Sequence, residues 1–444
     1  MSNILKLADI VKIKGGKRLP KGENLQITPN AHPYIRVRDM KGKFIPTDEL
    51  EYVPDHIFPK IKNYIVNTND VIVSIVGTIG LVSIITEKLN NASQTENCAK
   101  LSGLDRIDAE YLYYFLISEI GQAELQKATV GAVQPKLPLY GLENVSIDWK
   151  TRTEREEIVK QLNSLDNKIQ LNTQINQTLE QIAQALFKSW FVDFDPVRAK
   201  VQALSDGMSL EQAELAAMQA ISGKTPEELI ALSQTQPERY AELVETAKAF
   251  PCEMVEVDGV EVPKGWECCT FGDVAECFDS KRIPLSKQQR EKRKGDIPYY
   301  GATSVMDYVN EAIFDDIYLL IGEDGSVLKE DGTPFTQYIW GKSWVNNHAH
   351  VIKGKNGVST EHLMLFIQQT NITAYITGAV QLKLNQKNMN NIPFIKASNK
   401  TNLIFAQYIE PLYAKIRKNF DENKILETTR DLLLSRLLNG EINV

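Results

Sequence analysis

The sequence is poor in cysteine and contains no long apolar run. Five cysteines in 444 residues are too few and too irregularly spaced for a disulfide framework or a paired zinc site. The most apolar stretch, Val71–Ile85, is broken by Gly77 and Gly80, so it predicts two strands joined by a turn rather than a membrane helix. The N-terminal residues lack the apolar core of a secretory signal. We therefore expect a soluble cytoplasmic protein with no membrane contact.

Catalytic and ligand-binding motifs are also missing. The tract SGKT at Ser222–Thr225 resembles a phosphate loop, but Met218 occupies the position of the required earlier glycine. There is no glycine-rich dinucleotide fingerprint and no Asn/Asp-Pro-Pro-aromatic motif of an adenine methyltransferase. His348 and His350 stand two residues apart without further metal-ligand spacing, so we interpret them as ordinary polar residues. The sequence predicts no catalytic residue, no metal site and no cofactor.

Charge is distributed unevenly along a chain whose net charge is −7. Residues 199–262 hold twelve acidic side chains against four basic ones, and the remainder is close to neutral. Two short stretches are strongly basic: residues 12–43 hold nine Lys or Arg against two acids, and residues 281–294 hold seven against one. Such patches attract phosphate backbones at short range, although a solvated loop of no binding function can have the same composition.

The two basic stretches fall at matching places in an internal repeat. GAVQPKL at Gly131–Leu137 returns as GAVQLKL at Gly378–Leu384, an offset of 247 that continues without a gap into the following helix. Further matched pairs, at other offsets, are KRLP and KRIP (Lys17–Pro20 and Lys281–Pro284), EYLYYFL and EHLMLFI (Glu110–Leu116 and Glu361–Ile367), and the turns Gly77–Gly80 and Gly322–Gly325. Ordered similarity at several motifs indicates a two-unit duplication, because a solenoid has shorter periods and more copies.

Each unit is predicted to be a mixed domain followed by one long helix. Strand-like runs surround the glycine turns, at Ile72–Val76, Leu81–Ile85 and Ile317–Ile321, and short helices are expected near Ala109–Glu119 and Thr360–Gln369. Apolar residues then recur in alternating steps of four and three, the period of a coiled-coil seam. The seam positions are Ile158, Leu162, Leu165, Ile169, Leu179, Ala183, Leu186 and Trp190 in one helix and Phe405, Ile409, Leu412, Ile416, Leu426, Leu433 and Leu437 in the other.

Asparagine occupies the same two central seam positions in both helices. In an antiparallel pair Asn172 and Asn176 would face Asn423 and Asn419, and buried polar pairs there would fix the register. A narrow stripe also fits a helix that only docks on its own globular domain. A helix of about 33 residues is roughly 50 Å long, so a pair of them would space two reading domains like a ruler, one to two turns of DNA apart.

This plan resembles the specificity subunit of a Type I restriction–modification system. The clearest carriers are LEQIAQALFKSWFVDFDPVRAK (Leu179–Lys200), VPKGWE (Val262–Glu267), the two GAVQ motifs and RDLLLSRLLNGEI (Arg430–Ile442). The resemblance implies an α+β fold with two similar target recognition domains, separated by two long antiparallel coiled-coil helices with pseudo-twofold symmetry. It also implies a non-catalytic chain that binds a bipartite, asymmetric site in double-stranded DNA. Its implied partners are two adenine-methyltransferase subunits and restriction or translocase subunits.

The resemblance divides the chain into five segments. Residues 1–150 and 262–396 would be the recognition domains, and 151–195 and 397–444 the helical spacer. The acidic connection, residues 196–261, has no counterpart after the second helix, and the first unit lacks the opening Gly-Trp-Glu. We expect short helices in the connection around Ser209–Ile221, Pro226–Ser233 and Pro237–Ala249, either as a link between units or as a surface for a partner.

DNA-contact residues are predicted from the repeated basic motifs. The candidates for phosphate contact are Lys17, Arg18, Arg36 and Arg38 in the first unit and Lys281, Arg282, Arg290 and Arg293 in the second. Gln134 and Gln381 match in the repeat and either contact DNA or form structural loop corners. Two rival functions remain: a stand-alone DNA-binding regulator with two domains, and a fused nuclease–methyltransferase, which the missing motifs disfavour.

Overall fold

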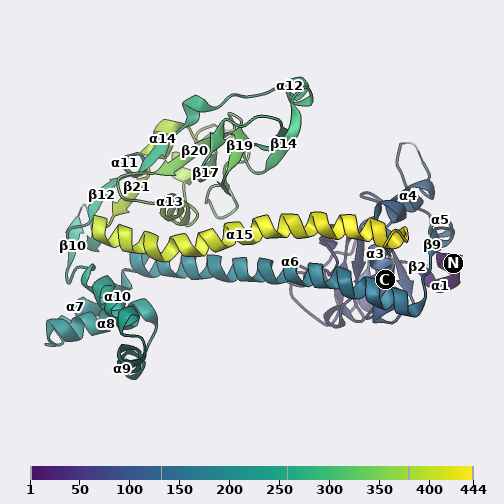
Figure 1. Cartoon of the computed structure of the whole chain (residues 1–444), viewed down its shortest axis with the longest axis horizontal. Coiled ribbons are helices and arrows are strands. Elements are labelled where there is room, and N and C mark those ends of the chain that lie inside the picture. Colours follow the sequence, from purple (N-terminus) through teal and green to yellow (C-terminus); the bar gives the residue numbers. More distant parts are fainter. Residues whose placement is uncertain (1–2, 132, 258, 379–380, 443–444) are drawn as a thin grey trace. The chain divides into compact units, whose positions relative to one another are not determined.

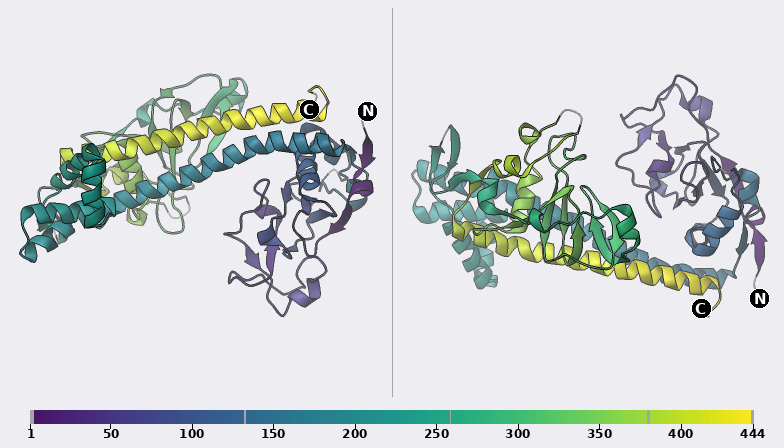
Figure 2. Two further views of the ribbon diagram at one scale, coloured as in Figure 1. Left: turned by 60° about the horizontal axis from the view of Figure 1, so that its bottom comes forward. Right: turned by 90° about the horizontal axis from the view of Figure 1, so that it is seen from above.

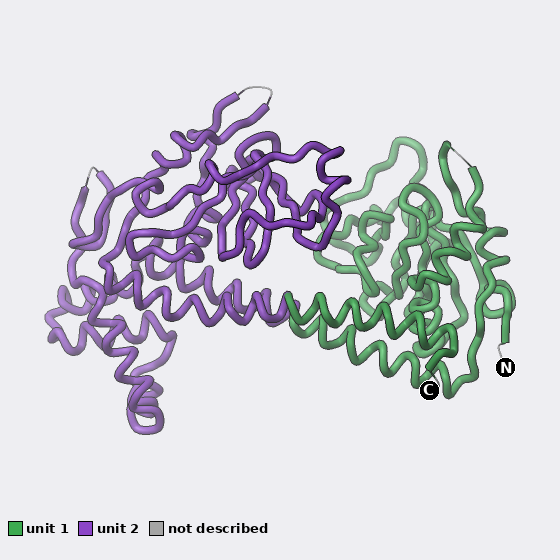
Figure 3. Tube along the Cα trace, turned by 45° about the horizontal axis from the view of Figure 1, so that its top comes forward, with its two compact units in different colours: residues 1–172, 421–444 green, residues 173–420 purple. Residues whose placement is uncertain are grey.

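A computed structural model describes residues 3–131, 133–257, 259–378 and 381–442. The chain forms two compact units, one of Met1–Asn172 with Asp421–Val444 and one of Thr173–Phe420 (Figure 3). Each unit contains a mixed domain and a stretch of two long helices. The predicted α+β class, with two domains and long helices, is confirmed; the pseudo-twofold relation between the units stays a prediction.

The mixed domain of the first unit is built on two small sheets and one strand pair. A mainly buried antiparallel sheet has the order β2 (Lys12–Gly15), β8 (Cys98–Ser102), β5 (Val71–Ser74) and β6 (Val82–Ile84). The second sheet has the order β4 (Glu51–Tyr52), β3 (Pro33–Ile35) and β7 (Ser93–Gln94), and β1 (Ile4–Lys6) pairs with β9 (Ser146–Asp148). The two strands predicted on either side of Gly77–Gly80 are β5 and β6.

Helix α3 (Arg106–Ile117) packs against this sheet and is buried along most of its length. In α3 every residue from Ala109 to Leu116 is buried, and the Asp105 side chain caps the helix by accepting from the Asp108 amide. The other short helices and turns are α1 (Leu7–Ile10), η1 (Val37–Asp39), α2 (Phe58–Ile61), η2 (Glu87–Leu89), α4 (Glu119–Lys127) and α5 (Leu139–Glu143).

The second unit repeats this plan. One sheet has the order β13 (Ala275–Cys277), β20 (Ala349–Gly354), β17 (Tyr318–Gly322) and β18 (Thr336–Ile339). The other has the order β15 (Val305–Val309), β14 (Lys294–Tyr300), β19 (Lys342–Val345) and β16 (Phe314–Asp315), and β12 (Glu267–Thr270) pairs with β21 (Pro393–Lys396). The helices and turns are α11 (Phe271–Val274), η4 (Asp279–Lys281), α12 (Lys287–Glu291), α13 (Thr360–Ile367), η5 (Thr373–Tyr375) and α14 (Gln386–Asn390).

The predicted duplication is confirmed by the strand pairing. The orders β2-β8-β5-β6 and β13-β20-β17-β18 correspond strand for strand, and the parallel pair β3–β7 corresponds to β14–β19. The bridges Val130–Lys136 and Thr377–Lys383 are separated by the predicted offset of 247. The glycine turns match differently from the sequence alignment: Leu137 N donates to Ile75 O where Leu384 N donates to Glu323 O, so Gly325, not Gly322, takes the place of Gly77.

The two long helices are α6 (Arg152–Phe187), extended by a π-helical turn at Lys188–Val192, and α15 (Asn399–Leu438). Within each unit the stretches of the two helices lie side by side (Figures 1 and 2). Within the first unit Asp166 contacts Arg430 and Asn172 contacts Asn423; within the second unit Asn176 contacts Asn419. Residue numbers fall along α15 as the numbers of their partners rise along α6, so the two helices run antiparallel within each unit. Every predicted seam residue is buried or half-buried, which confirms the seam.

Among its described residues, the acidic connection contains four helices and an antiparallel strand pair. They are α7 (Asp195–Ser205), α8 (Leu210–Ser222), α9 (Pro226–Thr235), α10 (Pro237–Lys248) and the β10–β11 pair (Met254–Val257 and Val260–Pro263). The three predicted helices are confirmed as α8, α9 and α10, and Ser209 and Thr225 cap the first two through capping boxes. Among the described residues, no helix is long and apolar enough to span a membrane.

Candidate nucleic-acid interface

Three repeated motifs of the first unit converge at one end of the β2-β8-β5-β6 sheet. Gly16 N and Lys17 N, in the turn leading into KRLP, donate to Cys98 O and Gln94 O. Ile75 N, just before the glycine turn, donates to Asn97 O in the same loop, and Leu137 N of the GAVQ arm donates to Ile75 O. Backbone hydrogen bonds therefore hold three segments close together: the KRLP segment (the KR motif), the glycine turn, and the GAVQPKL segment (the GAVQ arm). We call this group the loop edge of the first unit (Lys17–Pro20, Gly77–Gly80 and Gly131–Leu137).

The second unit has the same loop edge, formed by Lys281–Pro284, Gly322–Gly325 and Gly378–Leu384. Here Glu323 joins all three parts. Its backbone N–H donates to His348 O, its carbonyl accepts from Leu384 N at 2.8 Å, and its carboxylate accepts from Arg282 Nη1 at 2.7 Å. Motifs that lie at three different offsets in the sequence thus assemble into one surface in each unit.

The predicted phosphate-contact residues of the first unit differ in their partners. Lys17 is exposed, with its ammonium 5.7 Å from the centre of the Tyr64 ring. Arg18 forms an ion pair with Glu96 at 2.5 Å. Arg36 and Arg38 both contact the Glu51 carboxylate, from which Arg38 Nη2 is 2.7 Å away. The structure brings Lys17 and Arg18 to the loop edge and places Arg36 and Arg38 together beside β4.

The predicted phosphate-contact residues of the second unit also differ in exposure and in their partners. Lys281 is exposed over the Phe278 ring, whereas the Arg282 side chain is only 11% exposed and bonds Glu323 and the Ala349 carbonyl. Arg290 donates to Asp307 and Leu285 O, and Arg293 pairs with Glu311. The internal partners of Arg282 and Arg290 favour a structural role for these two, and DNA contact by any of the eight stays a prediction.

Both GAVQ motifs begin with a glycine in the left-handed region of φ. Gly131 and Gly378 have φ of 95° and 89°, and a Cβ on Gly378 would lie 2.1 Å from Gln381 O. Gln134 and Gln381 follow as exposed residues, so the backbone is a structural corner while both amide side chains stay accessible. Ala132, Ala379 and Val380 lie outside the described residues.

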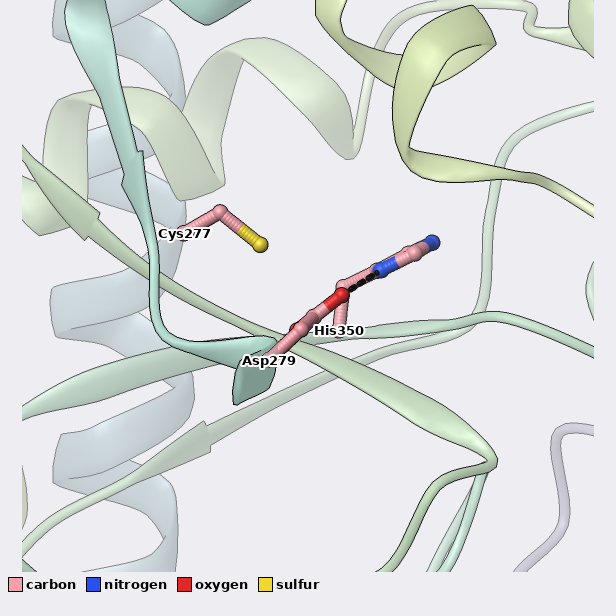
Figure 4. Close-up of side chains that lie close together, drawn as sticks. All are labelled: Cys277, Asp279 and His350. Atoms are coloured by element: carbon pink, nitrogen blue, oxygen red, sulfur yellow. Dashed lines mark hydrogen bonds and ion pairs between the residues drawn. The ribbon is translucent and has the colours of Figure 1, made fainter. Parts of the chain in front are cut away.

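One group of described side chains has the atoms of a metal site, Cys277, Asp279 and His350 (Figure 4). Both ring nitrogens of His350 are already engaged: Nδ1 lies 2.5 Å from Asp279 Oδ2 and Nε2 lies 2.7 Å from Leu384 O. Burial raises the pKa of the Cys277 thiol to about 12, which disfavours the thiolate that binds metals. The Arg282 guanidinium, 3.1 Å from Asp279, also repels a cation. This geometry fits a clamp on the GAVQ arm better than a metal ligand set.

The four asparagines of the helix pair meet as the sequence predicts. Asn172 Nδ2 donates to Asn423 Oδ1 at 2.9 Å, and Asn419 Nδ2 donates to Asn176 Oδ1 at 2.8 Å. All four are at most 8% exposed. Asn419 Oδ1 has no hydrogen-bond partner among the described residues, and the role of these four residues in fixing the register stays a prediction.

Two buried hydrogen-bond networks that the sequence did not predict, one in each unit, connect the mixed domain to the long helices. Tyr114 donates to Asp166 of α6, which also accepts from Arg430 of α15, and Lys43 contacts the same hydroxyl. Burial lowers the pKa of Lys43, which the sequence showed only as part of a basic patch. In the second unit Tyr338 donates to Glu361, and Arg417 of α15 contacts both. In the first unit Asn163 of α6 also contacts Glu110, so the sequence signal was the match of Glu110 with Glu361, two acids that are buried in the structure.

Comparison with known proteins agrees with this architecture. The profile of the Type I restriction modification DNA specificity domain matches residues 2–181 and 263–427. The HindI specificity subunit of Haemophilus influenzae is 44% identical over 69% of this chain and 71% of its own length. The MjaIX specificity subunit of Methanocaldococcus jannaschii is 22% identical over 100% of this chain and 94% of its own. A crystal structure of the S subunit from M. genitalium covers 98% of this chain and 96% of its own, with a TM-score of 0.51 and 16% identity. The chain therefore belongs to the specificity subunits of Type I restriction–modification systems, which recognise DNA and are not themselves enzymes.

Proposed function

We propose that this subunit reads a split, asymmetric site in double-stranded DNA and presents it to adenine-methyltransferase subunits. Residues 1–150 and 262–396 act as two target recognition domains, each reading one part of the site. The helices in 151–195 and 397–444 set the distance between the parts and dock two methyltransferase subunits. Restriction or translocase subunits join the complex for cleavage.

The observation that carries this proposal is the duplication of one domain topology with unlike loops. The sheets correspond strand for strand, yet the segment between the KR motif and the glycine turn differs in length and in its small helices, α2 in one unit and α12 in the other. Loops on a common scaffold are where base choice varies, because side chains on loops reach base edges in the grooves. Two scaffolds with different loops read two different sequences.

The helix pair supports a fixed spacing because its register is specified. Each unit holds one buried Asn pair in its stretch of the seam, and each pair penalises a shift of one helix along the other. A heptad of helix is about 10 Å long, which corresponds to about three base pairs at 34 Å per turn of DNA. The spacing is therefore expected to change in steps when whole heptads are removed.

Paired deletion tests the ruler. Removing residues 169–175 together with 420–426, which face them, takes one heptad and one Asn pair from the seam and keeps its period. The variant is expressed with its methyltransferase, and methylated adenines are mapped in the host genome. We expect the gap between the half-sites to shorten by about three base pairs, or methylation to be lost where the DNA cannot accommodate the twist.

Deleting residues 169–175 alone is the matched control. It removes the same length from one helix only, so the seam residues no longer face one another and the variant should fail to methylate. An unchanged gap in the paired deletion would refute the ruler. Failure of the wild-type chain to co-purify with an adenine methyltransferase, combined with repression of a promoter, would favour the stand-alone regulator.

A further inference from the structure

The loop edges carry identical exposed residues in two domains that share a topology but differ in their other loops. Folding accounts for part of each GAVQ motif: glycine supplies the positive φ, and Leu137 and Leu384 are completely buried. It does not account for the exposed members. Val133 is 93% exposed, and the glutamine and lysine of each motif, at Gln134, Lys136, Gln381 and Lys383, are exposed as well.

Residues repeated on the surface of both domains must meet something that both domains meet. Since the two halves are proposed to read different bases, a shared loop cannot be what distinguishes them. The feature common to any two stretches of duplex is the sugar–phosphate backbone, which positions a protein without carrying sequence information.

Charge at the loop edges fits that partner. Each edge presents one exposed lysine from the KR motif and one from the GAVQ arm, Lys17 with Lys136 and Lys281 with Lys383. Both acidic residues of the second edge are paired: Glu323 with Arg282 at 2.7 Å and Lys383 at 3.3 Å, and Asp324 with His348. The arginine of each KR motif is also held by an acid, Arg18 by Glu96. Arg282 thus braces its loop, whereas Arg18 is paired but 80% exposed. All four lysines stay exposed, although Lys383 is also paired with Glu323.

We infer that the loop edge of each unit is a sequence-independent phosphate clamp. Lys17, Lys136 and the Gln134 amide contact the backbone of one half-site, and Lys281, Lys383 and the Gln381 amide contact the other in the same way. The base-reading residues then lie elsewhere, in the segments that the two domains do not share. This inference rests on the proposed function and names the contacts by which both halves hold DNA.

The test uses the full chain purified with its methyltransferase subunits. Three variants remove the lysines: K17A/K136A in the first unit, K281A/K383A in the second unit, and the combination of all four substitutions. K88A and K342A are matched controls, because Lys88 and Lys342 are exposed lysines of the same two domains outside the loop edges. Binding to a duplex carrying the mapped site and to a scrambled duplex is measured between 50 and 200 mM salt.

We expect each double variant to bind both duplexes about tenfold more weakly, with a salt slope lower by about two, since each phosphate contact contributes about 0.9. The two halves should give equal losses, and the methylated sequence should not change. Q134A and Q381A give a second readout in which Lys383 and its contact with Glu323 are left intact; each should weaken both duplexes equally.

Three results would overturn the inference. Affinity and salt slope equal to those of K88A and K342A would show that the edges do not contact DNA. A changed methylated sequence would make them base readers. Loss of the methyltransferase at unchanged DNA affinity would place them in a protein interface. If the wild-type complex methylates a split site while any of these results holds, the proposed function stands and only the clamp is wrong.

Discussion

Replacing Asn176 by leucine tests whether the polar pairs specify the register of the helices. Asn419 Nδ2 donates to Asn176 Oδ1 at 2.8 Å, and the two residues are 0% and 4% exposed. The single variant leaves the Asn419 amide buried without this acceptor, which costs about 1–3 kcal/mol. The gain from burying leucine offsets part of this cost, so we expect the free energy of unfolding to fall by about 1–2 kcal/mol.

The double variant N176L/N419L should recover this loss. It removes both amides, including Asn419 Oδ1, which has no hydrogen-bond partner among the described residues. Replacing a buried polar pair by packed apolar side chains is often neutral or stabilising, so the double variant should equal or exceed the wild type. If N419L also costs about 1–2 kcal/mol, the coupling between the two substitutions is about 2–4 kcal/mol.

Urea denaturation followed by tryptophan fluorescence measures this coupling. Four of the five tryptophans, Trp190, Trp266, Trp340 and Trp344, lie in the second unit with the Asn176–Asn419 pair. If the double variant loses as much stability as the two single variants together, the pair makes no specific contribution and the reasoning fails. In cells, the stable double variant should methylate sites with a broader range of gaps, because one of the two constraints on register is gone.

Three further substitutions test the second unit by its unfolding in urea. Burial lowers the pKa of His362 to about 3. Below pH 6.5 this histidine therefore binds a proton in the unfolded chain but not in the folded chain, and the free energy of unfolding falls by about 1.4 kcal/mol per pH unit. Between pH 7.5 and pH 5 the free energy of unfolding of H362F should fall by about 2 kcal/mol less than that of the wild type; equal decreases would contradict this. G378A should cost more than G341A, because both glycines have positive φ but only a Cβ at Gly378 would meet backbone, that of Gln381. Burial raises the pKa of Asp279, but hydrogen bonds from His350 and the Val351 amide outweigh it and the net pKa is lowered. The advantage of the wild type over D279N should therefore be present at neutral pH and disappear as the pH falls through that lowered pKa.

The features predicted well from sequence are those set by period and repetition. The seam follows from apolar residues every 3.5 positions, a period that favours the packing of one long helix against another. Asn172 and Asn176 could be matched with Asn423 and Asn419 because polar residues interrupted both seams at the same positions. The helices of the acidic connection were predicted from local signals, a capping serine or threonine followed by a helix-forming run.

What sequence could not supply is the partner of each charge. Arg282 looked like a surface base in a basic stretch, but its guanidinium lies against Glu323, 41 positions further along the chain, and is mostly buried. Only Asp279, three residues earlier, hinted at an internal role. The glycine turns were misaligned by three residues because Gly77–Gly80 and Gly322–Gly325 share a spacing. The backbone bonds of Ile75 and Glu323 decide the match, and side-chain similarity does not reveal them.

Backbone bonds, more than side chains, are what the two halves have kept. Ile75 and Glu323 hold the same place in the loop edge, each accepting from the leucine that ends a GAVQ motif, although one is apolar and the other charged. Tyr111 and His362 likewise share a position on the helix behind the sheet and are both buried. A scaffold fixed by main-chain bonds lets side chains diverge without moving the strands that carry the reading loops. The exposed lysines and glutamines of the loop edges are the exception, since no main-chain bond requires them. Their recurrence in both halves is therefore best explained by a common ligand, which is the reason for placing the phosphate contact there.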